Sequence, residues 1–295
     1  QKLFRSEYGE DVADGIIHLF SAVEEDYSFR VKYYTAMNKL YTENYYKRLY
    51  EWCSEHNCML TGHSVEESSL YAQMWGCAGC SPSYEYEHIP GIDNLAKRNP
   101  AKLSARQVGS VAGQLGKKQI LTETFGCCGY YTTPKELKAI AEKQYVHGVN
   151  LMCHHLYSYS LAGQGKTDYP PCFSKHMTWW KQFPDFNLYF TRLGWLLANS
   201  QTQVNCAVFN PMASVYLNYE RFNEKPSMDT DRAFADLQYR LNEYGILYDL
   251  LDESILRRHA RAQGKRLVVG QRSYDYLIVP ECKTLSASTK ALLEA

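Results

Sequence analysis

The segment QILTETFGCCGYYTTPKELKAIAEKQYVHGVNLMCHHLY, residues 119–157, decides the fold class. Residues 119–123 form a short apolar run that predicts a buried strand. A helix is predicted from Thr133-Pro134, with proline in its first turn, to about residue 146. Residues 148–157 then predict a second strand. A strand, a helix and a strand in this order indicate a parallel sheet with a right-handed crossover.

Strands and helices also alternate on both sides of this segment. Before residue 200, apolar spacing predicts helices at 33–56, 68–76, 102–115 and 178–199, and strands at 57–62 and 84–89. Pro184 is expected to interrupt the first part of the last of these helices. Beyond residue 200 the predicted elements are a strand at 204–211, a helix at 229–243 capped by Asp229 or Thr230, short strands within 246–253, 266–270 and 274–280, and a helix from Ser286.

The element order predicts two units. Residues 1–200 are expected to form the C-terminal half of a barrel, and residues 201–295 a smaller, flavodoxin-like α/β domain that is not visibly finished. About four strands precede residue 200, whereas a closed (β/α)8 barrel needs eight. A partial barrel, with its remainder N-terminal to this chain, is therefore the expected arrangement. A compact four-stranded doubly wound domain is the alternative.

Composition narrows the class of protein. The chain has 32 basic and 32 acidic side chains, so charge gives no reason to expect nucleic acid or a membrane surface as a partner. No apolar run approaches the ~20 residues of a membrane helix, and no signal peptide is visible, which predicts a cytoplasmic protein. The ten irregularly spaced cysteines favour buried free thiols, and the lone pair Cys77 and Cys80 is a weak metal signal.

Aromatic residues are unusually frequent. The chain has 25 tyrosines and 5 tryptophans, and many lie in loop-like segments. Aromatic faces stack on the apolar faces of sugar rings, and tyrosine hydroxyls can bond to sugar hydroxyls. A tyrosine-rich core and surface would give the same composition, so both interpretations stay open.

Two carboxylates each follow a predicted buried strand. Glu123 ends the strand of QILTETFG, and Glu67, beside Glu66, follows the loop that begins at TGH. Glycoside hydrolysis needs two carboxyl groups, one to protonate the leaving oxygen and one to act as base or nucleophile. The sequence therefore gives Glu67 and Glu123 as a candidate catalytic pair, although acids after strands are common in α/β proteins.

Further polar and aromatic side chains are predicted near the same strand ends. Four histidines are expected on one rim of the sheet, where they could bind sugar hydroxyls, tune a carboxylate or ligate a metal. Asp168 and the tryptophans after it could form a sugar-stacking wall, or the tryptophans could anchor the next helix. The candidate substrate-binding residues are His63, His88, Asp93, His154, His155, Tyr157, Asp168 and Trp179. No metal ligands are assigned.

Several ordered motifs carry a resemblance to a known family. TGHSVEESSLYAQ (61–73), YEYEHIPGIDNL (84–95), QILTETFGCCGYYTTPKELK (119–138) and HGVNLMCHHLYSYS (147–160) resemble the barrel of the α-L-rhamnosidase-like glycoside hydrolases, family 106 and relatives. The resemblance implies a (β/α)8 barrel that hydrolyses terminal sugars with two glutamates and inverts configuration. Some members bind calcium near the site, and no other cofactor is implied.

By position, the resemblance matches Glu67 and Glu123 to the two catalytic glutamates. We expect Glu67 to be the general acid and Glu123 the base that activates water, or the nucleophile if configuration is retained. A carbohydrate is the expected partner, with a terminal α-L-rhamnoside the first choice. The alternatives are a clan-A-like retaining β-galactosidase and a non-catalytic carbohydrate-binding fragment.

Overall fold

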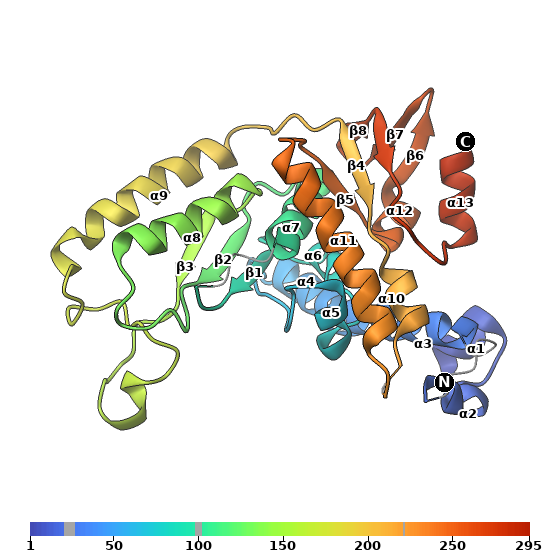
Figure 1. Cartoon of the computed structure of the whole chain (residues 1–295), viewed down its shortest axis with the longest axis horizontal. Coiled ribbons are helices and arrows are strands. Elements are labelled where there is room, and N and C mark those ends of the chain that lie inside the picture. Colours follow the sequence, from blue (N-terminus) through green and yellow to red (C-terminus); the bar gives the residue numbers. More distant parts are fainter. Residues whose placement is uncertain (21–26, 98–101, 221) are drawn as a thin grey trace.

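The computed structural model describes residues 1–20, 27–97, 102–220 and 222–295 (Figure 1). Within these ranges, no helix has both the length and the apolar character needed to cross a bilayer. The elements up to residue 200 are α1 (Lys2–Tyr8), α2 (Val12–Gly15), η1 (Ile16–Leu19), α3 (Tyr27–Tyr41), the π-helical turn η3 (Thr42–Tyr46), α4 (Lys47–Glu55), α5 (Leu70–Gly76), α6 (Ser81–Tyr84), β1 (Gly91–Asn94), α7 (Lys102–Leu115), β2 (Leu121–Thr124), α8 (Pro134–Val146), β3 (Leu151–His154), η4 (Gly163–Lys166), η5 (Trp180–Gln182) and α9 (Phe183–Ala198).

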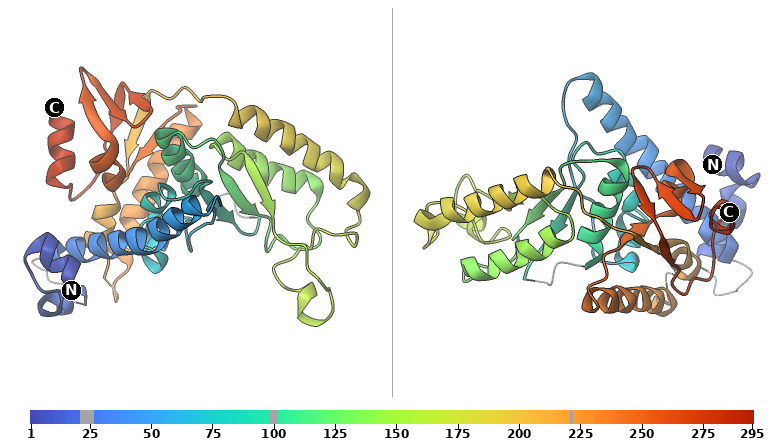
Figure 2. Two further views of the ribbon diagram at one scale, coloured as in Figure 1. Left: turned by 180° about the vertical axis from the view of Figure 1, so that it is seen from behind. Right: turned by 90° about the horizontal axis from the view of Figure 1, so that it is seen from above.

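The remaining elements form the second half of the chain. They are β4 (Cys206–Phe209), α10 (Met212–Asn218), α11 (Lys225–Glu243), β5 (Asp249–Leu251), α12 (Glu253–His259), β6 (Ala260–Gln263), β7 (Arg266–Val269), β8 (Arg272–Tyr274), β9 (Tyr276–Ile278) and α13 (Ala287–Glu294). Both chain termini lie at the same end of the molecule (Figure 2).

The first sheet is parallel, with strand order β1-β2-β3, which confirms the strand–helix–strand prediction for residues 119–157. Helix α8 covers one face of this sheet. Gln144 of α8 bonds to the hydroxyls of Thr122 and Thr124, whose side chains share that face. Side chains alternate along a strand, so Glu123, which lies between Thr122 and Thr124, projects from the opposite face. Its register partner on β3, Cys153, projects from the same face as Glu123. That face remains open, and Cys153 is exposed.

Two of the predicted strands differ in the structure. The strand predicted at 57–62 is reduced to one parallel bridge between Thr61 and Ile89. The strand predicted at 84–89 is wrong, because α6 ends at Tyr84 and β1 begins only at Gly91. The described part of residues 1–200 therefore holds three strands in one sheet, which does not close a barrel.

Two helix starts also differ from prediction. Pro184 lies in the first turn of α9, where its missing N–H is tolerated, so it begins this helix rather than interrupting it. Helix α11 begins at Lys225, before the predicted caps Asp229 and Thr230, again with a proline in its first turn. The predicted cap Ser286 is confirmed, because its hydroxyl accepts a bond from the N–H of Thr289.

The second sheet is also parallel, with strand order β5-β4-β9, and an antiparallel sheet β6-β7-β8 lies beside it (Figure 1). Helix α7 joins the two halves of the molecule. Its Ser110 hydroxyl accepts a bond from the N–H of Leu250 in β5, and its Gln114 amide donates to the Leu250 carbonyl. One apolar core includes side chains from both parallel sheets, such as Ile92 and Phe209.

Candidate active site

Glu123 projects from the open face of the first sheet, one residue before the end of β2. Its Oε2 lies 3.1 Å from Nε2 of His63, and its Oε1 lies 3.6 Å from Nε2 of His155. The Glu123 side chain is 26% exposed, so it is held on both sides and still reachable from solvent. The structure thus brings together three of the residues predicted from sequence.

Asp93 lies beside Glu123, because the two residues are partners in the register of β1 and β2. Its Oδ1 is buried, and no described residue donates a hydrogen bond to it. Burial raises the pKa of Asp93, and the negative charge of Glu123 adds to this, while His63 and His155 oppose it. Asp93 is therefore a carboxyl with a raised pKa next to Glu123.

Glu67 is buried next to Asp93, with 4% of its surface exposed. Its Oε1 accepts hydrogen bonds from the Ser64 N–H at 2.7 Å and the Tyr84 hydroxyl at 3.3 Å. Its Oε2 accepts one from the Asp93 N–H at 3.1 Å. Burial raises the pKa of Glu67 well above its usual range, as expected of a general acid. These contacts also tie the loop after residue 61 to the backbone of β1.

The loops around the carboxyl edge of this sheet contain strained backbone. Positive φ angles occur at five non-glycine residues there: Glu66, Ala96, Phe125, Cys127 and Tyr169. Such conformations cost about 1–3 kcal/mol each and cluster at functional sites. This edge therefore has the backbone signature of a site, which no sequence pattern reveals.

Tyr169 adds an aromatic surface beside the carboxylates. Its ring centroid lies 5.4 Å from that of His155, and its side chain is about half exposed. Gly126 supports the other side of His155, because a Cβ there would lie 3.2 Å from the His155 ring and 2.9 Å from Leu95. The loops after β2 and β3 thus fix His155 against Glu123 and leave an aromatic side chain at the rim.

His88 does not belong to this group. It precedes β1 and so lies toward the amino end of the sheet, and the prediction that it shares the rim with Glu123 is wrong. Its Nδ1 accepts a bond from the Leu60 N–H, its Nε2 lies 3.0 Å from the Ser54 hydroxyl, and its ring stacks on Tyr50. These contacts fasten α4 to the sheet.

His154 faces away from Glu123, and its predicted place on the rim is also wrong. It is the register partner of Thr124, whose side chain lies on the helix-covered face. Its ring packs against Phe173 and Phe183, and burial lowers the pKa of His154 to about 4. Of the two neighbouring histidines, only His155 reaches the carboxylates.

The other predicted residues lie outside the group. Tyr157 and Asp168 are exposed on the long loop after β3, which extends away from the sheet (Figure 1). Trp179 packs edge-on against Phe183 and Phe186 at the start of α9. Of its two predicted roles, these contacts fit the helix anchor.

The described residues offer no metal-binding cluster, since no three His, Cys, Asp or Glu side chains lie close enough to hold an ion. All ten cysteines are free, but the expectation that such thiols are buried holds for only five of them, and Cys58, Cys127 and Cys153 are exposed. Cys77 and Cys80 lie 3.4 Å apart between their sulfur atoms and are both buried.

The chain was compared with known proteins in sequence and in structure. No family model matches the chain. A protein of Formosa agariphila named "Putative beta-glucuronidase" is 24% identical over 196 residues, which cover 65% of this chain and 15% of that protein. The structure of a rhamnosidase from Novosphingobium sp. PP1Y matches 99% of this chain with a TM-score of 0.69 and 15% identity, and the match covers 28% of that chain.

The structural match establishes the fold. The whole described arrangement is similar to a segment of the rhamnosidase, at an identity too low to transfer residue roles. This chain spans about a quarter of that protein and 15% of the curated relative.

Proposed function

We propose that this chain carries catalytic residues of a glycoside hydrolase that cleaves a terminal sugar, with an α-L-rhamnoside the first candidate. One observation carries the proposal: Glu123 is held between His63 and His155 on an open sheet face, next to a second carboxyl. The fold shared with a rhamnosidase segment and the curated relative's name support the same class of enzyme.

Glu123 is proposed as the base or nucleophile. A carboxylate in that role has to be ionised and accessible, and Glu123 is 26% exposed with two imidazole rings beside it. Those rings can orient the carboxylate and stabilise its negative charge. General acid–base catalysis of this kind contributes roughly 10²–10⁴-fold to the rate.

Asp93 is proposed as the group that protonates the leaving oxygen. Its pKa is raised by burial, as a general acid requires, and its Oδ1 has no donor among the described residues. Glu67 was the sequence-based candidate for this role. Since its oxygens already accept three bonds, we assign it the positioning of Asp93 through the Asp93 N–H.

The choice of Asp93 or Glu67 as the general acid changes the predicted configuration of the product. Asp93 and Glu123 are register partners on neighbouring strands, which lie about 4.7–4.9 Å apart. Retaining enzymes separate their carboxyl groups by about 5–5.5 Å, and inverting enzymes by about 6.5–9.5 Å. We propose that the two carboxyl groups keep about the spacing of their strands, so that an Asp93–Glu123 pair retains configuration, in contrast to the inversion that the family resemblance implies for Glu67 and Glu123.

The test uses the longest available protein that contains this chain, with aryl and alkyl α-L-rhamnosides as substrates. NMR of the first-formed product reads the anomer, and we expect retention. Asp93→Asn should lose much more activity on the alkyl substrate than on the aryl one, because a good leaving group needs little protonation. Glu67→Gln should lower the activity on both substrates by the same factor.

Inversion, together with a leaving-group-dependent loss in Glu67→Gln, would return the role of acid to Glu67. Failure to hydrolyse any terminal glycoside in a broad panel would overturn the proposed class of enzyme.

A retaining β-glycosidase is the second candidate. The name of the curated relative favours it, and the close spacing of Asp93 and Glu123 is compatible with it. Aryl β-D-glucuronides and β-D-galactosides, assayed beside the rhamnosides, separate the two specificities.

The proposal treats residues 1–200 as part of a (β/α)8 barrel and residues 201–295 as a flavodoxin-like domain. In a closed barrel, the remaining strands would pair with the edges of this sheet, and the face bearing Glu123 and Cys153 would point to the barrel interior. The proposed mechanism involves protein side chains and water, with no step through calcium.

A further inference from the structure

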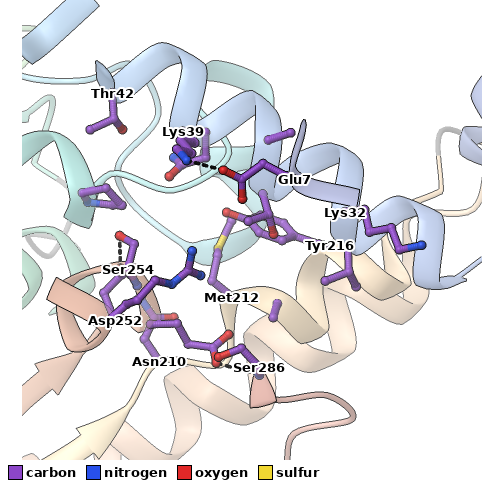
Figure 3. Close-up of a pocket in the computed structure, with 18 of the residues that line it drawn as sticks. Glu7, Lys32, Lys39, Thr42, Asn210, Met212, Tyr216, Asp252, Ser254 and Ser286 are labelled. Atoms are coloured by element: carbon purple, nitrogen blue, oxygen red, sulfur yellow. Dashed lines mark hydrogen bonds and ion pairs between the residues drawn. The ribbon is translucent and has the colours of Figure 1, made fainter. Parts of the chain in front are cut away.

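A pocket lies at the carboxyl edge of the other parallel sheet, away from Glu123 (Figure 3). Its cavity volume is about 440 Å³, which falls within the ~300–1,000 Å³ of small-molecule sites. Asn210 directly follows β4 and Asp252 directly follows β5, and helices α1 and α3 close the opposite side. In open α/β sheets ligands bind outside the carboxyl ends of the strands. This pocket contains none of the residues around Glu123.

Asn210 gives the pocket an unused hydrogen-bond acceptor. The residue is 3% exposed and lines the cavity, and no described residue donates to its Oδ1. Its backbone N–H is occupied, because it donates to the Leu251 carbonyl. A buried amide oxygen without a donor is costly, so a ligand that donates a hydrogen bond there would gain affinity.

Several charged groups at the cavity wall already have protein partners. Asp252 accepts bonds from the N–H groups of Ser254 and Ile255, and Glu253 accepts one from the Ser286 N–H. On the wall formed by α1 and α3, Lys39 pairs with Glu7 at 2.5 Å (Figure 3). An ionic ligand that binds to these groups would have to compete with their protein partners.

The lining also mixes polar and apolar groups. Basic and acidic side chains both line the cavity, among them Lys39 and Glu253, while Met212, Ala213 and Leu285 supply apolar surface. A ligand suited to this lining is uncharged, donates hydrogen bonds and has an apolar face. A sugar ring has all three properties.

We propose that this pocket is a second carbohydrate site, which binds one neutral sugar residue through a hydroxyl that donates to Asn210 Oδ1. The pocket alone supports this assignment, whether or not Glu123 is catalytic. Binding here would hold a carbohydrate on this chain at a position separate from the group around Glu123.

The test follows the methyl resonance of Met212 in protein with ¹³C-labelled methionine methyl groups, since the chain has only 7 methionines and Met212 lines the pocket. L-Rhamnose and D-glucose are the neutral probes, and inorganic phosphate and D-glucuronate the charged ones. We expect at least one neutral sugar to shift the Met212 signal saturably, and neither anion to do so. Glu123→Gln should leave this response intact.

Two variants remove the site in different ways. Asn210→Leu deletes the acceptor and is expected to fold normally, because the amide oxygen has no donor to lose. Thr35→Trp fills the cavity from α3, and Met37→Trp, on an exposed position of the same helix, is its matched control. Asn210→Leu and Thr35→Trp should weaken sugar binding at least tenfold, and Met37→Trp should not.

Absence of a Met212 response to both neutral sugars would overturn the proposal. So would an undiminished response in Asn210→Leu and Thr35→Trp, or a response to phosphate or glucuronate alone. Because the readout is binding at Met212, a failure here is distinct from a failure of the proposed hydrolysis.

Discussion

Glu87 is a carboxyl with no exposed surface, placed just before β1. Its Oε2 accepts a bond from the Gly91 N–H, and burial raises the pKa of Glu87 to about 8 from its usual 4.5. The folded state thus binds this proton more tightly than the unfolded state does. The contribution of Glu87 to the free energy of unfolding is therefore most favourable below pH 4.5, and it is lost as the pH rises to about 8.

Glu87→Gln removes the charge and keeps the shape of the side chain, so it should reduce the pH dependence of the free energy of unfolding. We expect the variant to be more stable than the wild type at pH 8 by on the order of 3 kcal/mol, with a smaller difference at pH 5. Urea unfolding at the two pH values measures this, with the exposed Glu55→Gln as the control. Parallel pH profiles for Glu87→Gln and the wild type would show that Glu87 does not titrate as described.

His154 gives the opposite pH dependence. Burial among phenylalanines lowers the pKa of His154 to about 4 from 6.5, so its neutral form is favoured in the folded state. The contribution of neutral His154 to the free energy of unfolding is complete above pH 6.5, and it falls as the pH drops toward 4. His154→Leu should lose less stability between pH 7 and pH 4.5 than the wild type, by roughly 1–3 kcal/mol. Denaturant unfolding with the exposed His176→Leu as control checks this, and equal acid losses in wild type and His154→Leu would contradict it.

The same histidine marks a limit of prediction at the residue scale. Neighbouring residues of a strand project to opposite faces, so only one of His154 and His155 can reach Glu123. The choice depends on the register of β3 against β2, which the sequence does not reveal. Glu123 was predictable, because it lies near the end of the apolar strand β2. His63 and Asp93 were proposed from strands at 57–62 and 84–89, which the structure reduces to the Thr61–Ile89 bridge.

At the scale of single elements, α8 offers a direct test of helix capping. The Thr133 hydroxyl accepts a bond from the Glu136 N–H, and the Glu136 carboxylate accepts one from the Thr133 N–H. Thr133→Ala removes half of this reciprocal pair and should lower the free energy of unfolding by about 1 kcal/mol. Thr191→Ala, at an exposed threonine within α9, is the control. Equal effects of the two substitutions in urea unfolding would contradict the capping role.

The elements also explain where prediction failed. The segment at 84–89 alternates polar and aromatic residues, as a half-buried strand does, yet Tyr84 and Glu87 are both fully buried. Pro82 in the first turn of α6 starts a short helix there, and the strand begins later. A burial pattern set by tertiary contacts overrode the local alternation. Helix α7 was predicted correctly because its apolar spacing extends over three turns.

At the scale of the whole molecule, the two parallel sheets each present a carboxyl edge with polar residues. One edge carries Glu123 and its histidines, and the other carries Asn210 and the pocket that it lines. Alternation of strands and helices predicted both sheets. It could not predict that α7 bonds to β5 and joins them, because those contacts link residues about 140 positions apart.

The account depends most on Glu123. The direct measurement is kcat/KM of Glu123→Gln on the preferred glycoside, in the longest protein that contains this chain. The neighbouring loop variant Glu66→Gln is the matched control, and the melting temperature reports folding. We predict a loss of at least about 10³-fold in Glu123→Gln, an unchanged melting temperature, and near-normal activity in Glu66→Gln. A Glu123→Gln enzyme that keeps more than a tenth of wild-type activity would contradict the assignment of this site.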